Sequence, residues 1–236
     1  MKLSSQAKFL ILAEIAVFAA ISWYFWNESR IREIYGILPP YSGQDISYAG
    51  ASDFTASLPA NFIKERKDAL KELERLLSRS PKNYDDWLQV GVSKKFFNNY
   101  EGARDAWEYA KLVDPNVSTA YLNLGGLYGA YLNDYPKAEF NYKTALSIDS
   151  LVFPYYYLAL ADFYENFYIE KKNQAESVLL QGAAAIPFDV SIKVRLGLYY
   201  KKAGFKDKAI KYLKEALAIN PSLKEVREEL LILSKS

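Results

Sequence analysis

The sequence predicts an all-α protein of stacked helical hairpins, preceded by one membrane-spanning helix. Three observations lead to this prediction. A phrase typified by "KEALAINP", which ends at Pro221, recurs along the chain. Its copies are separated by 34, 35, 37 and 34 residues, and a constant period of this length indicates a stacked helical array. The apolar residues between the copies follow helical spacing, and an 18-residue apolar run lies near the N-terminus. The copies end at Pro81, Pro115, Ser150, Pro187 and Pro221.

The composition excludes several classes of function. The chain has 236 residues, a formal net charge of +2, and neither cysteine nor histidine. Disulfides, thiolate metal sites and cysteine nucleophiles are therefore excluded, and the commonest general base is missing. The small net charge gives no field that would attract nucleic acid. The glycine-rich stretch "GGLYGA" lacks the lysine of a phosphate-binding loop. We expect no enzyme activity, no cofactor, no metal and no nucleic-acid partner.

Residues 1–35 are predicted to form a membrane anchor. The run from Phe9 to Trp26, residues 9–26, contains a single charge, Glu14. A helix of this length reaches about 27 Å, which is enough to cross the hydrocarbon core. Aromatic residues cluster at its end, as is typical of the membrane interface. The alternative is a cleaved signal peptide, but the apolar run exceeds the usual signal core of about 7–15 residues.

The flanking charges predict the orientation of this anchor. Lys2 and Lys8 precede the run, whereas Arg30 and Arg32 follow it, so the positive-inside rule leaves a thin margin. We expect a single-pass membrane protein whose helical domain is extracytoplasmic, with the cytoplasmic face as the alternative. Glu14 either reaches toward the headgroups or pairs with another membrane helix.

Residues 36–58 are predicted to form a flexible or extended linker. The stretch from Gly36 to Ser57 contains paired prolines, several glycines and small polar residues, and no helical or strand period persists in it. It is interpreted either as a tether or as an extended segment that lies on a partner.

The remaining residues, 59–236, are predicted to form the helical array. Within each period the apolar and small residues lie three, one and three residues apart, and then four and three apart, which predicts two helices joined by a turn. Small residues such as Gly91 and Gly125 let the paired helices approach closely, and proline ends the second helix. The predicted segments are a leading helix at 59–83, repeats at 84–117, 118–152, 153–189 and 190–223, and a capping helix at 224–236.

These residues resemble the tetratricopeptide repeat. The phrase "YLNLGGLY" followed by "AEFNY" matches both helices of that family's pattern, and the resemblance covers about residues 62–234. It implies an α-solenoid of about four full repeats, whose first helices line a concave face that binds a protein or a peptide. The residues that this resemblance places in the groove are Leu88, Val92, Phe96, Leu122, Asn123, Gly126, Gly129, Ala130, Leu158, Asp162, Glu165, Val194, Arg195, Leu198 and Lys202.

Two features of this groove leave alternatives open. Gly126, Gly129 and Ala130 form either a floor without side chains, where a peptide backbone could lie, or a tight helix packing. The third unit contributes acidic groups and the fourth contributes basic ones, which either orients a peptide or makes a solvated face. Leu88 and Val92 stand where the lysine and asparagine clamp of chaperone-binding relatives would begin, so no terminal carboxylate ligand is predicted.

The aromatic residues of the second and third units suggest a further contact surface. Tyr131, Tyr155 and Tyr168 are expected to be exposed, and exposed aromatics often mark interfaces. The alternative is a thicker core around an irregular turn.

The predicted function is that of a membrane-anchored scaffold or adaptor for protein–protein interaction. The alternative is a fixed accessory subunit or assembly factor of a membrane complex, in which the transmembrane helix is itself a contact.

Overall fold

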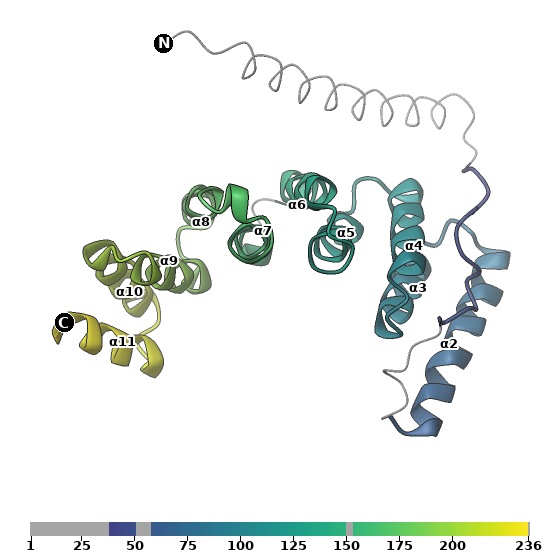
Figure 1. Cartoon of the computed structure of the whole chain (residues 1–236), viewed down its shortest axis with the longest axis horizontal. Helices are drawn as coiled ribbons and strands as arrows, with labels where there is room; N and C mark the ends of the chain where they lie inside the picture. The colour runs from purple at the N-terminus through teal and green to yellow at the C-terminus, as the bar shows by residue number, and fades with distance from the viewer. Residues whose placement is uncertain (1–37, 51–57, 150–152, 236) are drawn as a thin grey trace, which may run out of the picture. The chain divides into compact units, whose positions relative to one another are not determined.

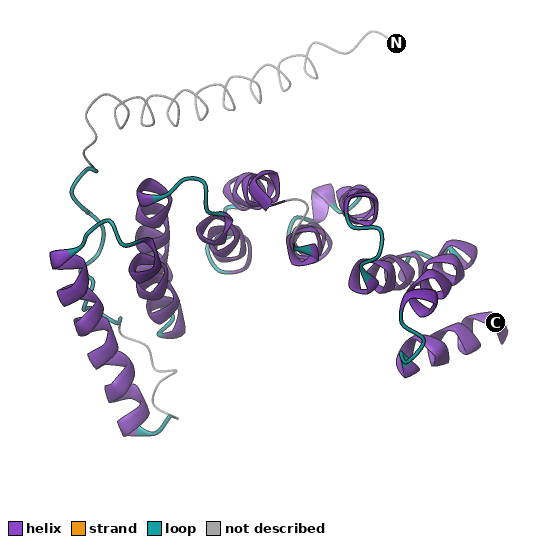
Figure 2. Cartoon of the chain, turned by 180° about the vertical axis from the view of Figure 1, so that it is seen from behind, coloured by secondary structure: helices purple, strands orange, loops and turns teal. Residues whose placement is uncertain are grey.

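The computed structural model describes residues 38–50, 58–149 and 153–235 (Figure 1). In these ranges the regular structure is entirely helical, with ten α-helices, one short 3₁₀ helix and no strand (Figure 2). The chain divides into two compact units, residues 1–42 and 43–236, and the helices described below belong to the second. The predicted anchor, residues 1–35 with its apolar run at 9–26, lies outside the described ranges. Within them, no helix combines the length and the apolar character needed to span a bilayer.

Four helical pairs follow one another in chain order, with one helix before them and one after (Figure 1). Consecutive helices pack against each other, both within a pair and from one pair to the next. The bounds are α2 Ala60–Arg79, α3 Tyr84–Phe96, α4 Tyr100–Val113, α5 Ser118–Ala130, α6 Tyr135–Asp149, α7 Pro154–Asn166, η2 Ile169–Lys171, α8 Gln174–Ala185, α9 Val190–Lys202, α10 Lys206–Ile219 and α11 Lys224–Lys235.

Local sequence sets where these helices begin and end. The Asn83 side chain accepts from the backbone N–H of Asp86 at 3.3 Å and so caps α3. Asp189 caps α9 in the same way, through the N–H of Ile192 at 2.8 Å. At the other ends, α2, α4, α8 and α10 each stop two residues before a proline of the repeated phrase. Proline cannot continue a helix. The expectation that these prolines end the second helices is confirmed for these units.

Small residues allow the close contact of the two helices in a pair. A Cβ atom on Gly91 would lie 2.2 Å from Nε1 of Trp107, and one on Gly197 would lie 2.5 Å from the Leu213 side chain. Neither position could hold a larger residue without movement of its partner. The matching alanines of the second helices are fully buried: Ala103, Ala138, Ala175 and Ala209. The predicted complementarity of small and large residues is therefore present.

One hydrophobic cluster connects the successive pairs. It begins at Ala103 and Trp107 on α4 and continues to Val226 and Leu233 on α11. Each pair therefore buries its apolar surface against its neighbours, as in a repeat array. The closing helix α11 contributes only one apolar side to this core, because Leu231 and Ile232 on its other side remain exposed.

Candidate functional site

The candidate site is the exposed side of the first helices of the four pairs, α3, α5, α7 and α9, which we call the first-helix face. In Figure 1, α5 and α7 lie on the same side of the row of pairs, below α6 and α8. Because each pair contributes one first helix, the first-helix face draws on four separate stretches of sequence. Its geometry depends on how each first helix is held against the pair before it.

Hydrogen bonds hold three of these helices in place, one of them buried and two partly buried. In each, a tyrosine of the first helix donates to a glutamate on the second helix of the preceding pair. A hydrogen bond to a charged acceptor contributes about 1.5–3 kcal/mol, so these contacts help to fix the stacking. The three bonds are Tyr128 Oη to Glu108 Oε1 at 3.1 Å, Tyr164 Oη to Glu139 Oε1 at 2.7 Å, and Tyr200 Oη to Glu176 Oε1 at 2.5 Å.

The middle bond belongs to a larger charged cluster. Glu139 also accepts from Lys143 at 2.6 Å and from Lys171, on η2, at 2.7 Å. Burial would raise the pKa of Glu139, but the hydrogen bonds from Lys143, Lys171 and Tyr164 outweigh it and lower that pKa. Burial, together with the bond to this carboxylate, raises the pKa of the Tyr164 phenol. The tyrosine therefore stays protonated and remains a donor.

Four equivalent positions form a row across the first-helix face. Each lies one residue after the small residue of its helix, and the four are Val92, Gly126, Asp162 and Leu198. The apolar side chains at the two ends of the row are 43% and 39% exposed. Asp162 is also exposed. The row therefore offers apolar contacts at both ends and polar or bare positions between them.

The glycines of α5 differ in their surroundings. A Cβ atom on Gly129 would lie 2.8 Å from the Phe163 ring, and Gly129 is buried. This glycine serves the packing of α5 against α7, so the groove-floor alternative does not hold for it. On Gly126 a Cβ atom would be 3.5 Å from Tyr142 Oη, which is an ordinary contact. Gly126 is therefore free of a packing requirement and leaves a bare position on the first-helix face.

The predicted charges lie between α7 and α9 and neutralise one another. Arg195 donates to Asp162 Oδ1 at 2.5 Å through Nη2 and at 3.1 Å through Nε, and it also pairs with Glu165. The Glu165 side chain is only 2% exposed, and Lys202 Nζ lies 3.9 Å from it. Acid and base therefore form one local ion-pair network. The sequence left open whether these charges orient a peptide or make a solvated face, and these contacts show that the acidic and basic groups pair with one another.

The other predicted groove residues are half-buried or exposed at the edges. Ala130 and Lys202 are exposed, and Asn123 is half-buried. Phe96 packs edge-to-face on Phe62 of α2, with ring centroids 5.8 Å apart. The half-buried apolar residues of the four first helices pack against the main core from the same face: Leu88, Leu122, Leu158 and Val194.

The three aromatic residues expected at the surface have different environments. Tyr155 is 62% exposed and Tyr131 is 42% exposed, so both are accessible. Tyr168 is only half-buried rather than exposed, since its ring lies 5.5 Å from Tyr135 and 5.8 Å from Phe163. Tyr168 therefore follows the alternative, a thicker core around an irregular turn, because it lies between α7 and η2 and its ring packs on residues of α6 and α7.

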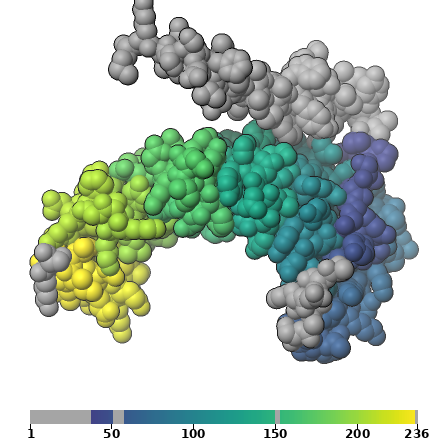
Figure 3. Space-filling view, in the orientation of Figure 1, coloured from purple at the N-terminus to yellow at the C-terminus, as the bar shows by residue number. Residues whose placement is uncertain are grey.

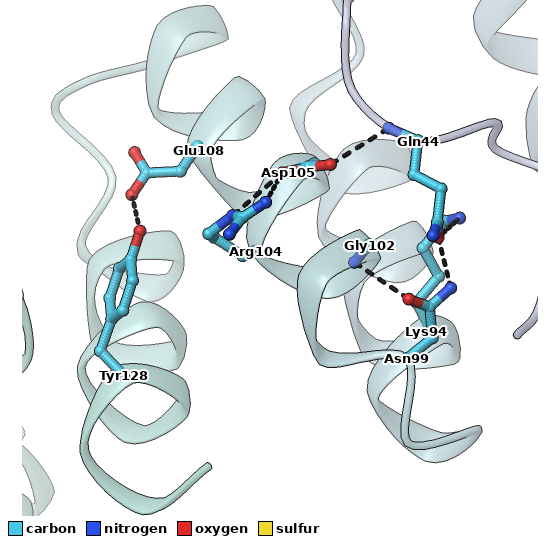
Figure 4. Close-up of polar contacts among 8 residues, drawn as sticks. All are labelled: Gln44, Lys94, Asn99, Gly102, Arg104, Asp105, Glu108 and Tyr128. Carbon is cyan, nitrogen blue, oxygen red and sulfur yellow. Dashed lines mark hydrogen bonds and ion pairs between the residues drawn. The ribbon is translucent and has the colours of Figure 1, made fainter. Parts of the chain in front are cut away.

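Sequence reasoning missed a polar site at the first pair. Lys94 on α3 is fully buried. Both Lys94 and Asn99 donate hydrogen bonds to residues of the predicted linker (Figure 4). A signal was available, because Lys94 stands three residues after Gly91, where the other three units carry Tyr128, Tyr164 and Tyr200. Within the described part of the chain, no group of three or more acidic side chains is placed to hold a metal ion.

Comparison with known proteins identifies the repeats. Residues 118–150 and 191–223 each match the family model described as "Tetratricopeptide repeat". The chain therefore contains tetratricopeptide repeats at these two places, and its described residues form an all-α array of helical pairs, as the sequence predicted.

The chain is also similar to individual proteins. It is 31% identical over 68 residues to Superkiller complex protein 3 of Homo sapiens, a match that spans 29% of this chain and only 4% of that protein. The crystal structure of MamA is similar with a TM-score of 0.55 at 18% identity, over 75% of this chain and 96% of that chain. YrrB, described as a TPR protein with an unusual peptide-binding site, has a TM-score of 0.51 at 17% identity, over 86% of this chain and 96% of that chain. At these identities the two structures share the fold alone.

Proposed function

We propose that the protein is an interaction scaffold that binds an extended segment of a partner protein along the first-helix face. The observation that carries this proposal is the row of equivalent positions. Val92 and Leu198 expose apolar side chains at its ends, and Gly126 leaves a bare position between them. The four positions come from four helical pairs. A ligand must therefore run across several pairs to contact them all, as an extended peptide would.

The chemistry of the row indicates the kind of segment that fits. Apolar side chains of a ligand would bury the exposed surfaces of Val92 and Leu198. The ligand backbone would approach most closely at Gly126, where no side chain stands in the way. The Asp162 carboxylate remains accessible to a donor, because this side chain is 53% exposed even while its Oδ1 pairs with Arg195.

Site-specific photo-crosslinking in the full chain tests this assignment. A photoreactive residue is placed at Val92 or at Leu198, and the matched control carries it at Gln181, an exposed position on the second helix α8. We expect the same partner to be crosslinked from both first-helix positions and not from Gln181. Crosslinking of the partner from Gln181 alone would contradict the proposal.

A pair of substitutions at one position gives a second test. Gly126→Leu fills the bare position, whereas Gly126→Ala adds only a methyl group that the structure accommodates. We expect the leucine variant to bind the crosslinked partner about tenfold or more weakly, while the alanine variant keeps most of the affinity. Equal binding by both variants, with folding intact, would remove Gly126 from the site.

We infer, in addition, that residues 9–26 hold this scaffold at a membrane. The apolar run and its single charge support this inference. The domain would then be extracytoplasmic, and the alternative is an accessory subunit or assembly factor in which Glu14 contacts another membrane helix. We expect the full chain to resist extraction from membranes by alkaline carbonate. This resistance should be lost when Ala16 and Ala20 are both replaced by aspartate. Release of the unmodified chain by carbonate would contradict the anchor.

A further inference from the structure

The segment Gln44–Gly50, which we call the strap, packs against the first helical pair. Its contacts centre on Lys94, near the end of α3, and on Asn99 and Asp105, at the start of α4 (Figure 4). In the space-filling view the purple segment that includes the strap lies beside the blue surface of α2 and α3 (Figure 3). The strap falls within the region that the sequence predicted to be linker. It is neither a free tether nor an extended segment on a partner, because it forms a turn that packs on its own chain.

Lys94 binds the strap through carbonyl oxygens. Its ammonium group donates to the main-chain oxygen of Asp45 at 2.6 Å, to that of Tyr48 at 2.9 Å, and to Gln44 Oε1 at 3.2 Å. The residue is 0% exposed. Burial of an ammonium group costs several kcal/mol unless its hydrogens are satisfied, and the strap supplies all three of these acceptors. Lys94 therefore depends on the strap to be tolerated where it is.

Asn99 links the strap to the start of α4. Its Oδ1 accepts from the N–H of Gly102 at 3.0 Å and caps the helix, while its Nδ2 donates to Gln44 Oε1 and, at 3.4 Å, to the carbonyl of Tyr48. On the neighbouring turn of α4, Asp105 accepts from the N–H of Gln44 at 3.1 Å. The same asparagine thus serves both the helix and the strap, so binding of the strap supports the cap.

Two glycines make room for this contact. Gly50 has φ +108°, and a Cβ atom there would lie 2.9 Å from Cβ of Asn99. A Cβ atom on Gly102 would lie 2.3 Å from Gln44 Oε1. Both positions require glycine for close approach, and Gly50 requires it also for its backbone conformation. Ala49, beside Gly50, is buried at this contact.

The position of Lys94 in the repeat explains why the first pair differs from the others. In the later pairs a tyrosine occupies this place and donates to a glutamate of the preceding pair. No complete pair precedes α3 among the described residues, because α2 stands alone before it. The strap takes over the role of acceptor, and a lysine, with three donors, matches its carbonyl oxygens better than a phenol with one.

We propose that Lys94, Asn99 and Asp105 form a peptide-recognition site, separate from the first-helix face, whose occupant is the strap of the same chain. The site binds main-chain oxygens at the two ends of a turn, in which the N–H of Tyr48 donates to the carbonyl of Asp45 at 3.3 Å. It selects that segment by a glutamine at its first position and by a glycine at its seventh. Occupancy attaches the segment to the first pair and holds the start of α4. This proposal is independent of which partner the first-helix face binds.

Hydrogen exchange of the full chain, followed by mass spectrometry, tests the proposal. Gly50→Val should displace the strap without changing any helical residue, and Lys94→Met should remove its main donor. We expect exchange of the strap and of residues 99–105 to become about tenfold faster or more in both variants, with α9 and α10 unchanged as the measure of intact folding. The matched control is Ser47→Ala, since Ser47 bonds only to Asp45 within the strap, and it should exchange like the unmodified chain.

Two further measurements decide what occupies the site. Protection of the strap should be independent of protein concentration, and loss of protection on dilution would show that a second copy supplies the strap, which overturns the assignment. A synthetic peptide of residues 43–50, at the millimolar level that a short tether provides, should slow exchange of residues 99–105 in Gly50→Val but not in Lys94→Met. The proposal would be overturned if the peptide did not slow exchange of residues 99–105 in Gly50→Val. It would also be overturned if the strap exchanged as fast in the unmodified chain as in the two variants.

Discussion

Replacement of Gly91 by alanine should destabilise the first helical pair. The added Cβ atom would lie 2.2 Å from Trp107 Nε1, far inside the contact distance of about 3.5 Å. Trp107 is buried and its indole N–H donates to the carbonyl of Leu88 at 3.1 Å, so the ring cannot move without loss of that bond. Overpacking of this kind costs about 1–3 kcal/mol, and the close distance points to the upper end. The better helix propensity of alanine offsets about 1 kcal/mol.

The net loss is therefore about 2 kcal/mol, which lowers the melting temperature by about 4–8 °C for a chain of this size. Thermal unfolding followed by far-ultraviolet circular dichroism measures it. The matched control is Gly126→Ala, where the nearest atom is 3.5 Å away and alanine should raise the stability by up to about 1 kcal/mol. If Gly91→Ala were as stable as the unmodified chain, close helix contact would not be the reason for the small residue, and the account of the repeat packing would fail.

Three further predictions concern the polar groups between the pairs. Tyr164→Phe should cost about 1–2 kcal/mol in urea unfolding, since Glu139 keeps its two lysine partners, and a loss below the error of the measurement would remove the tyrosine bond from the account. The lowered pKa of Glu139 contributes stability that is complete above its usual value of 4.5 and disappears as the pH falls through the lower folded value. Glu139→Gln should therefore show a shallower loss of stability on acidification below about pH 4.5 than the unmodified chain, and parallel curves would contradict this. Arg195→Met should cost about 3 kcal/mol because it leaves buried Glu165 without its main partner, whereas Asp162→Asn, which preserves that pair, should cost less than about 1 kcal/mol, and the reverse order would refute the network.

The helical architecture could be predicted because its determinants are local or periodic. A small residue recurs in the first and in the second helix of every unit, as at Gly125 and Ala138, and prolines follow the ends of most second helices. The first-helix face follows from the same period, since equivalent residues of successive units lie on equivalent sides. Within that face, however, the sequence left two interpretations of the glycines open. Gly129 serves packing because Phe163, from the next pair, lies against it, whereas Gly126 has no such neighbour.

The charges and aromatics were harder to place. Asp162, Glu165 and Arg195 are on two helices, and only the stacking of those helices shows that the guanidinium reaches both carboxylates. Tyr168 lies in the connection between α7 and α8, where the third unit is longer than the period, so its direction could not be deduced from its spacing. Side-chain pairing between units depends on the rotation of one pair against the next, which the period alone does not determine.

The sequence by itself determined the repeating pairs of helices, the small residues at their contacts and the absence of cysteine and histidine chemistry. Those properties depend on residue type and on spacing within about 35 residues. Only the tertiary structure decided that the strap returns to Lys94 and Asn99, about 50 residues further along the chain. Three of its hydrogen bonds are accepted by main-chain oxygens of the strap, which every residue possesses, so side-chain spacing alone did not indicate the contact. In the repeat pattern, the contact was indicated only by Lys94, a lysine at the position where the other three units have a tyrosine.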